Sequence, residues 1–399
     1  MINQNLPAVD RKIRVLFLPK WYPNRYDPMP GLFIMRQAEA ITPFCDVAVI
    51  YVHPDPDCPN KIEVEFSEEN SVRVLRVYYR TSRWLHSPVG KVLNFRRFYQ
   101  AHRKAFNSIR EFNPDLVHSH ILTRMGFIGW LITRKRHIPL IISEHWSRYF
   151  PENNTYQGWF RKLISRFVVK HASAIVAVSD PLRRAMEKSG LQHSRFCVIP
   201  NVVDTSQLIP SQEGEKPDVR TIIHISCFDD KSKNISGFLR SLQELSKLRK
   251  DFICLMTGAG PDWEAMREYA AFLRIPDTCV KFIGMKEGKE FEELLCNADF
   301  SVLSSRYETF GTVVVESLSC GVPVVATRVG VAADVINVMN GLLVPPDDEQ
   351  AMTDAMFQML GLCREYDKVA IRDSVAVTFS KETVGQQIVT LYKELLKNT

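Results

Sequence analysis

The segment that decides the fold reads SSRYETFGTVVVESLSCGVPVVATRVG and spans residues 304–330. It follows one short apolar run, DFSVLS at 299–304, and contains another, VPVVAT at 322–327. Both runs have the length and the β-branched composition of strands that are buried on two faces. Between them, Gly311 precedes a stretch long enough for a short helix. A strand, a helix and a strand in this order predict a parallel βαβ unit.

The same alternation continues through both halves of the chain. In the first half, strand-like runs occur at 14–18, 46–52, 72–79, 115–120, 139–143, 174–179 and 196–200. In the second half, they occur at 221–226, 252–256, 280–284, 299–304, 322–327 and 341–345. Segments with helical periodicity separate the runs, so we expect a parallel sheet with helical crossovers in each half.

The two series predict an α/β protein with two Rossmann-like, doubly wound parallel-sheet domains. A polar segment with three prolines, at 199–218, separates them. We therefore expect a first domain over residues 1–203 and a second over residues 204–377. A last helical segment, 378–399, has no strand after it, and we expect it to pack back on the first domain.

The bulk composition excludes several classes of protein. Hydrophobic residues make up 45% and charged residues 24%, as in soluble globular proteins. No run is apolar for long enough to cross a bilayer, and the N-terminus lacks the apolar core of a signal peptide, which together predict a cytoplasmic protein. The nine cysteines include no C-x-x-C pair, so we expect buried reduced thiols, not a disulfide framework or a zinc site.

The charge is distributed unevenly along the chain. Residues 1–200 hold 30 Lys and Arg against 16 Asp and Glu, whereas the remainder holds 21 against 29. The segment 89–112 has helical periodicity, with Phe95, Phe98 and Phe106 on its apolar side and basic residues on another side. This balance favours contact with an anionic membrane surface or an anionic, lipid-diphosphate-linked acceptor. The alternative is a core-facing helix with a solvated basic face. No nucleic-acid-binding motif is present, so a nucleic-acid partner is not expected.

Glu308 and Glu316 stand on either side of Phe310-Gly311, just beyond a predicted strand. Ligands of open α/β sheets bind beyond the carboxyl ends of the strands. Gly311 lets the chain turn, and the free N–H groups at Thr312 would face an anion. The carboxylates would repel a phosphate but can accept hydrogen bonds from sugar hydroxyls. A diphosphate flanked by two sugars, as in a nucleotide-sugar, fits this layout. The alternative is one carboxylate favouring the helix dipole and one solvated loop glutamate.

Residues 284–348 resemble the retaining glycosyltransferases of the GT-B fold, in glycosyltransferase family 4 (glycosyltransferases group 1). The hallmark of that family is E-x7-E with a central Phe-Gly, followed by C-G-x-P-V-V-A-T and G-x-L-V-P. The residues of this chain in those places are Glu308, Phe310, Gly311, Glu316, Cys320, Gly321, Pro323 and Gly341. Weaker resemblance covers nearly the whole chain. It implies two domains that face a central cleft, with the acceptor in the first domain and a nucleotide-sugar in the second.

The resemblance also implies roles for individual residues of the second domain. Lys233 would lie on the donor diphosphate and Glu308 on the transferred sugar, both as catalytic residues. Glu316 would hold the ribose. The remaining donor-binding candidates are Gly258, Phe310, Gly311 and Thr312. The arginine that usually accompanies the lysine is not evident, and Lys231 is a candidate substitute. Without the resemblance, Lys233 would be interpreted as a solvated lysine.

In the first domain, His120 ends a predicted strand, and the resemblance implies that it faces the donor sugar as a third catalytic residue. A satisfied structural histidine is the alternative. Gly31, Glu144 and His145 are candidates for the cleft and its acceptor side. A metal site at Glu144-His145 is not expected, because no further ligand has helical spacing with His145.

Together these features predict a glycosyltransferase that moves a sugar from a nucleoside-diphosphate-sugar to a hydroxyl of a glycan or a lipid-linked acceptor. The resemblance implies that the transfer retains the anomeric configuration. Biosynthesis of a cell-surface glycan is the expected setting, on the inner face of the plasma membrane. No metal and no cofactor beyond the co-substrate are expected, because no D-x-D pair is suited to a metal. The alternatives are a nucleotide-sugar epimerase on the same fold and a non-catalytic protein that binds glycans or lipids.

Overall fold

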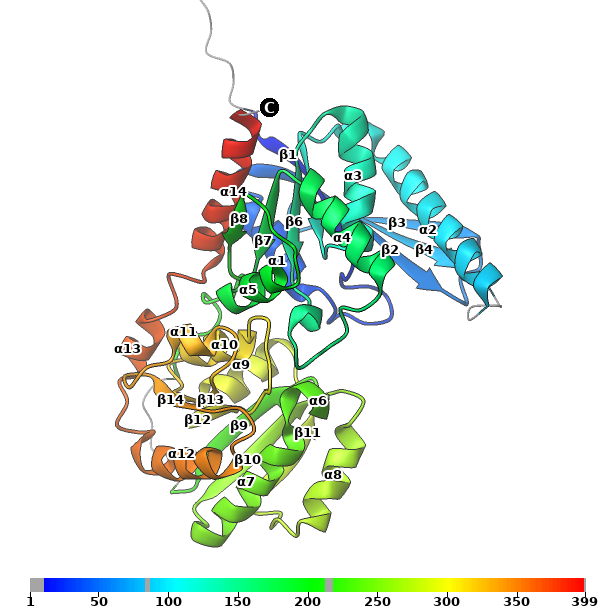
Figure 1. Ribbon diagram of the computed structural model, residues 1–399. Helices are drawn as coiled ribbons and strands as arrows, with labels where there is room; N and C mark the ends of the chain where they lie inside the picture. The colour runs from blue at the N-terminus through cyan, green and yellow to red at the C-terminus, as the bar shows by residue number, and fades with distance from the viewer. Residues whose placement is uncertain (1–10, 83–86, 212–217, 398–399) are drawn as a thin grey trace, which may run out of the picture.

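The computed structural model describes residues 11–82, 87–211 and 218–397. Within these ranges the chain forms two α/β domains, the first drawn above the second in Figure 1. Each domain is built on one predominantly parallel sheet, so the predicted fold class is confirmed. Residues 199–211 lead from the last strand of the first sheet towards the second sheet.

The first sheet has the order β3-β4-β2-β1-β5-β6-β7-β8. Its strands are β1 Ile13–Pro19, β2 Cys45–Asp55, β3 Ile62–Glu69, β4 Val72–Arg80, β5 Leu116–His120, β6 Leu140–Glu144, β7 Ala174–Ala177 and β8 Phe196–Val198. Neighbours run parallel except β3 and β4. The strand order reverses between β1 and β5, so ligands are expected at the carboxyl ends of these strands.

The second sheet has the order β11-β10-β9-β12-β13-β14 and is parallel throughout. Its strands are β9 Arg220–Ser226, β10 Phe252–Gly258, β11 Val280–Gly284, β12 Phe300–Leu303, β13 Val324–Thr327 and β14 Gly341–Val344. The strand order reverses between β9 and β12. The segment quoted at the outset therefore begins at the switch point, where doubly wound sheets bind ligands.

Strand β3 is absent from the strands expected above. Residues 62–69 read IEVEFSEE, in which apolar and polar residues alternate as in a half-exposed edge strand. Asn70 and Ser71 follow with φ of 48° and 65°, which a tight turn between antiparallel strands requires. The alternation and the turn are the signals that predict this edge hairpin, and its charged outer side chains protect the edge from further pairing.

The helices cover both faces of the sheets. They are α1 Leu32–Ile41, α2 Pro88–Ser108, α3 Arg124–Arg136, α4 Trp159–His171, α5 Asp180–Lys188, α6 Asp230–Lys233, α7 Ile235–Leu248, α8 Trp263–Phe272, α9 Gly288–Cys296, α10 Thr312–Ser319, α11 Ala332–Val335, α12 Glu349–Leu362, α13 Lys368–Asp373 and α14 Lys381–Lys397. Two 3-10 turns, η1 Arg110–Phe112 and η2 Ser147–Tyr149, complete the elements of the described residues.

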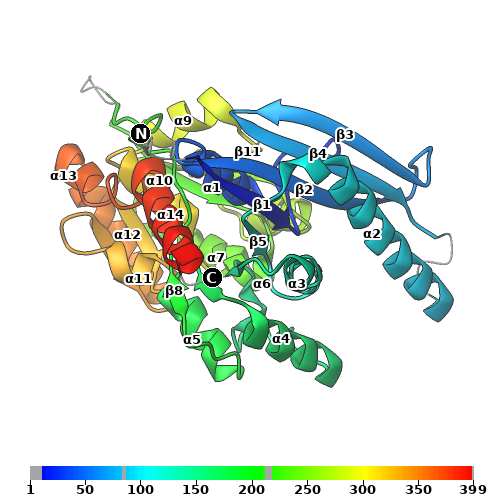
Figure 2. The ribbon, with the colours of Figure 1, turned by 90° about the horizontal axis from the view of Figure 1, so that it is seen from above.

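Alternate residues of β2 belong to two different hydrophobic clusters. Ala48 and Ile50 belong to the cluster that includes residues of α2, α3, α4 and α5, and Val47 and Val49 belong to the cluster that includes residues of α1 and α14. The last helix thus lies on the first domain, beside α1, as both ribbon views show (Figures 1 and 2). The two helices approach closely at Gly385, where an added Cβ would lie 2.3 Å from the carbonyl oxygen of Ala40.

Two expectations about side chains are wrong. Cys296, which ends α9, and Cys320, which follows α10, form a disulfide, although reduced thiols are expected from their spacing. Their contact depends on how α9 and α10 pack, which spacing does not reveal. Phe95 is 57% exposed on α2, whereas Phe98 is buried against Tyr79. The apolar side of this helix is therefore narrower than its periodicity indicates.

Candidate active site

Lys233 and Glu308 meet at the switch point of the second sheet. Lys233 ends the short helix α6 after β9, and Glu308 lies in the loop after β12. The Lys233 ammonium pairs with Oε1 of Glu308, and Ser305 Oγ donates to the same oxygen at 2.8 Å. Burial alone would lower the pKa of Lys233, but the carboxylate outweighs it, and the pKa is raised. The ammonium is therefore charged at neutral pH, in a place that is largely closed to bulk water.

Glu316 lies one turn into α10 and reaches the other domain. Its Oε1 accepts a hydrogen bond from Nη1 of Arg36 on α1, at 3.1 Å, and its side chain is only 9% exposed. Arg36 lies 280 positions away in the sequence, and no motif there indicates this contact. The pair shows that Glu316 faces the gap between the domains and is not turned to bulk solvent.

Helix α10 begins at Thr312, directly beside Glu308. Gly311 precedes it with φ of 88°, a conformation that glycine adopts without strain. The first N–H groups of the helix have no carbonyl partner within it and can bind an anion. Phe310, a donor-binding candidate, is buried against Phe379 instead. The Phe310 carbonyl oxygen accepts a hydrogen bond from the N–H of Val331 at 2.7 Å, so this residue mainly holds the loop in place.

Across the gap, His120 ends β5 and is fully buried between two other imidazoles. Its ring stacks on His118 at 4.3 Å, and its Nδ1 lies 3.2 Å from Nε2 of His145. Burial, with smaller effects of His118 and His145, lowers the pKa of His120 well below its usual value. Its Nε2 has no hydrogen-bond partner among the described residues. A neutral ring with one free nitrogen can form a hydrogen bond with a substrate but carries no charge.

Glu144, a candidate for the acceptor side, is fully buried. Its Oε1 accepts from the N–H groups of His145 and Trp146, and its Oε2 accepts from the N–H of Leu122 and the hydroxyl of Tyr149. Both oxygens are thus occupied by donors of the chain itself. The carboxylate shapes the loop after β6, and it is not free to bind an acceptor.

Two glycine candidates are required by close packing at the carboxyl ends of strands. Gly31 precedes α1 with φ of 77°, and an added Cβ would lie 2.2 Å from the carbonyl oxygen of Trp21. Gly258 ends β10 with φ of 136°, and an added Cβ would lie 1.9 Å from the carbonyl oxygen of Ser226. Gly31 thus lets two parts of the loop between β1 and α1 lie close together, and Gly258 does the same for the ends of β9 and β10.

Other contacts join the two domains around these residues. Ser179 Oγ donates to the carbonyl oxygen of Thr309 at 2.5 Å, and the rings of Phe150 and Tyr307 lie 6.4 Å apart. Lys231, the candidate substitute for the missing arginine, donates to the carbonyl oxygen of Asn153 at 3.2 Å. Its ammonium therefore spans the domains and does not join the Lys233–Glu308 pair.

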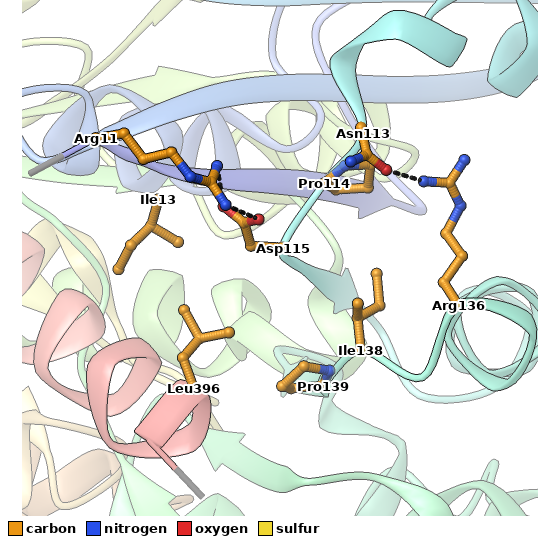
Figure 3. A pocket seen from close by; sticks show the side chains of 9 residues that line it. All are labelled: Arg11, Ile13, Asn113, Pro114, Asp115, Arg136, Ile138, Pro139 and Leu396. Atoms are coloured by element: carbon orange, nitrogen blue, oxygen red, sulfur yellow. Dashed lines mark hydrogen bonds and ion pairs between the residues drawn. The ribbon is translucent and has the colours of Figure 1, made fainter. Parts of the chain in front are cut away.

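A pocket of about 540 Å³ lies elsewhere, at the amino ends of β1, β5 and β6 (Figure 3). Arg11 and Asp115 form an ion pair there, and Arg136 donates to Asn113. The polar groups of this hollow thus satisfy one another. Because doubly wound sheets bind ligands at the opposite edge, we place the candidate site at the carboxyl ends.

Two further findings concern the described ranges only. Nowhere in them do three or more His, Cys, Asp or Glu side chains gather in a way that could hold a metal ion. No helix in them is both long enough and apolar enough to cross a membrane.

Comparison with known families agrees with this division of the chain. A domain family described as Glycosyltransferase Family 4 matches residues 38–207, and one described as Glycosyl transferases group 1 matches residues 219–361. The chain is a two-domain glycosyltransferase. The two matches correspond to the two sheets, and the second contains Lys233, Glu308 and Glu316.

Curated relatives of this glycosyltransferase extend over most of its length. A Bacillus subtilis (strain 168) protein named as a teichuronic acid biosynthesis glycosyltransferase, TuaC, is 23% identical over 373 residues, which cover 86% of this chain and 88% of that protein. D-inositol 3-phosphate glycosyltransferase from Corynebacterium urealyticum is 26% identical over 324 residues, which cover 73% of this chain and 74% of that protein.

Solved structures share the whole architecture of the glycosyltransferase. Sucrose-phosphate synthase from Thermosynechococcus elongatus superposes with a TM-score of 0.78 at 18% identity, covering 97% of this chain and all of that one. Anabaena HepE, in complex with UDP and glucose, has a TM-score of 0.71 at 17% identity, covering 96% of this chain and 99% of that one. These neighbours show the GT-B fold of this chain.

Proposed function

We propose that this glycosyltransferase moves a hexosyl group from a nucleoside-diphosphate-sugar to a hydroxyl of a glycan or lipid-linked acceptor, with retention of configuration and without a metal ion. The observation that carries this proposal is the cluster at the switch point of the second sheet. There the Lys233 ammonium, the Glu308 carboxylate and the first amides of α10 gather beside Glu316, opposite the first domain. The complex of the neighbour HepE with UDP and glucose supports the class of donor.

Each group of the cluster suits one part of such a donor. Lys233 and the free N–H groups of α10 would face the diphosphate, because the ammonium carries a full positive charge and the amides are fixed donors with partial positive charge. Glu316 would accept hydrogen bonds from the ribose hydroxyls and Glu308 from those of the transferred sugar. Glu316 forms an ion pair with Arg36, and Glu308 forms one with Lys233, so a bound donor would replace both ion pairs.

In the reaction, the bond between the anomeric carbon and the diphosphate oxygen breaks, and a bond to the acceptor oxygen forms on the same face. The acceptor hydroxyl loses its proton to an oxygen of the departing β-phosphate. Lys233 and the α10 amides stabilise the charge that develops on this phosphate, which is where fixed positive groups lower the barrier most. His120 remains neutral and would use Nε2 in a hydrogen bond to a sugar hydroxyl.

The first test is a thermal-shift panel of UDP-, GDP- and ADP-sugars with and without Mg²⁺. A ligand that binds the folded state raises its melting temperature by mass action. We expect one nucleotide class to stabilise the protein with or without Mg²⁺. Incubation of that donor without acceptor then separates transfer from epimerisation, because an epimerase would alter the free sugar nucleotide.

The role of Glu316 is tested by two variants that break the same ion pair. In Glu316→Gln the ribose loses its carboxylate, and we expect donor affinity to fall about tenfold or more. In Arg36→Met the carboxylate is freed for the ribose, so donor affinity should be unchanged or higher. Equal losses in both variants would mean that the pair is only a link between the domains.

We further propose that the enzyme works on an anionic membrane, at the inner face of the plasma membrane, in the biosynthesis of a cell-surface glycan. Trp159 and Phe160 on α4 and Val89 and Val92 on α2 are strongly exposed, with cationic side chains among them. Helices α2, α3 and α4 lie on one face of the first sheet (Figures 1 and 2). Exposed apolar and cationic side chains together suit an anionic bilayer surface. The name of the relative TuaC supports the surface-glycan setting.

Vesicle sedimentation tests this surface. We expect the protein to bind phosphatidylglycerol vesicles but not phosphatidylcholine vesicles. High salt should abolish this binding. Trp159→Ser should weaken binding several-fold, whereas Phe272→Ser removes an equally exposed aromatic residue from the second domain and should not. Equal effects of the two changes would argue against this surface.

A further inference from the structure

Two cations of the first domain lie over one tryptophan without an acidic partner. Lys20, just after β1, places Nζ 3.4 Å from the ring centre of Trp146, and Arg148 places Cζ 3.2 Å from the same ring. In the described part of the chain, neither side chain has a hydrogen bond or an ion pair. Arg148 is only 6% exposed, and its Nε is buried without a partner. Such a guanidinium is costly to bury unless something pairs with it.

The surroundings of Lys20 are positive overall. Burial, together with the nearby Arg148 and Arg124, lowers its pKa to about 8, and Arg161 acts in the same direction. The Glu144 carboxylate opposes this shift with a smaller effect. Both oxygens of Glu144 already accept hydrogen bonds from three backbone N–H groups and the Tyr149 hydroxyl, and Glu144 does not pair with either cation. An additional anion is what this cluster lacks.

The cluster lies beside the gap between the domains. Lys20 follows β1 and Trp146 follows β6, on either side of the strand that ends at His120. The same loop after β6 continues to Phe150, which contacts Tyr307 next to Glu308. A molecule held at Lys20 and Arg148 would therefore lie across from the donor cluster, on the acceptor side.

We propose that Lys20, Trp146 and Arg148 form a subsite for an anionic group, a phosphate or a carboxylate, on the acceptor. The two cations would pair with the oxyanion, and the Trp146 ring would pack against the adjoining sugar or alkyl part. This inference deepens the proposed function and depends on it for the identity of the acceptor. The donor diphosphate is a second source of the same chemistry, and the experiment separates the two.

The test measures binding of glycerol 3-phosphate and of glycerol by calorimetry, at constant ionic strength, with the donor site filled by the nucleoside diphosphate that stabilises the protein most. We expect glycerol 3-phosphate, but not glycerol, to bind the wild type. Lys20→Met should weaken that binding about tenfold, whereas Lys135→Met, which removes an exposed lysine at the far end of α3, should leave it unchanged. Arg148→Met should give a similar loss where it folds.

The outcomes are distinct. Equal binding by the wild type and Lys20→Met, or no preference for glycerol 3-phosphate over glycerol, would overturn the subsite. If Lys20→Met weakens binding of the nucleoside diphosphate as strongly as binding of glycerol 3-phosphate, the two cations bind the donor and the proposal is wrong. Should no nucleotide bind at all, the proposed function fails, while glycerol 3-phosphate titrated into the free protein still tests the subsite.

Discussion

Lys233 is the single residue on which the chemistry of the candidate site depends most. It supplies the only ammonium that pairs with Glu308 among the described residues, and its positive charge lies where the diphosphate would leave. We predict that Lys233→Met lowers kcat by about 100-fold or more, the usual effect of removing one group that stabilises developing charge. Steady-state kinetics with the donor identified by thermal shift would measure this.

The matched control for Lys233→Met is Lys231→Met. Lys231 is two residues from Lys233, and its ammonium donates a hydrogen bond to the carbonyl oxygen of Asn153. Replacing it by Met changes the net charge by the same amount. Its loss should change kcat by less than a few-fold. If Lys231→Met were as damaging as Lys233→Met, Lys231 would be the substitute for the missing arginine, and the geometry described here would be wrong on that point.

Lys20 offers a second test at the residue scale. With its pKa lowered to about 8, chiefly by burial, about half of this side chain is neutral at pH 8, compared with less than about 1% of an ordinary lysine. Only the neutral amine reacts with acylating reagents. We predict that trace acetylation at pH 8 labels Lys20 several-fold faster than Lys135, as measured by mass spectrometry. Glycerol 3-phosphate should slow the labelling of Lys20 alone, and equal rates for the two lysines would contradict the prediction.

At the scale of elements, the loop after β12 is held in place by Gly330, which follows β13. Its φ is 53°, and an added Cβ would lie 2.4 Å from the Phe310 carbonyl oxygen and 2.8 Å from Cβ of Glu308. We predict that Gly330→Ala moves the Glu308 loop, lowers stability by about 3 kcal/mol and abolishes most activity. Thermal unfolding and donor binding would report both effects.

Gly288 is a close control for Gly330, because it has the same φ of 53° but no atom within 4 Å of an added Cβ. Gly288→Ala should cost only the strain of the backbone, about 1 kcal/mol, and leave activity intact. A loss of activity in this variant would show that the backbone conformation, and not the contact with Glu308, determines the effect at Gly330.

The elements also show what the sequence can predict. Runs such as 252–256 and 322–327 predict their strands because a strand buried on both faces must be apolar throughout. The E-x7-E segment predicts Glu308 beside the start of α10, because a βαβ unit orders them along one edge. Lys233 lies outside that segment, and only the family resemblance implies its place there. Arg36 and Arg148 have no such signal. Their significance arises from contacts and burial that only the tertiary structure creates.

At the scale of the whole molecule, the two domains are joined by two neighbouring crossings of the chain. The N–H of Val203 donates to the carbonyl of Phe379 at 2.9 Å, and Thr205 Oγ1 donates to the carbonyl of Ala376 at 3.2 Å. These two hydrogen bonds hold the two crossings side by side. Arg36–Glu316 and Ser179–Thr309 join the domains elsewhere, so a donor that replaces Arg36 would alter how firmly the gap is held.

The acid stability of the two domains should differ, because buried histidines are unevenly shared between them. Burial lowers the pKa of His102 to about 4 and of His118 and His145 to about 3, all in the first domain. The second domain has His224, whose pKa is lowered to about 4, also by burial. In an unfolded chain each would titrate near 6.5. Between these values the unfolded state binds more protons, so stability is lost as the pH falls below about 6.5.

Each such histidine contributes a loss of about 1.4 kcal/mol per pH unit below its unfolded pKa. We predict that calorimetric unfolding resolves two transitions as the pH is lowered from 7.5 to 5.0, with the transition of the first domain falling faster. His102→Gln should reduce the number of protons that the first domain takes up on unfolding by one, which makes its stability less dependent on pH. His102 suits this test because it lies on α2, away from the gap, and its side chain is hydrogen-bonded to the Phe98 carbonyl. Parallel shifts of the two transitions would contradict this prediction, and a single transition would mean that the domains unfold as one unit.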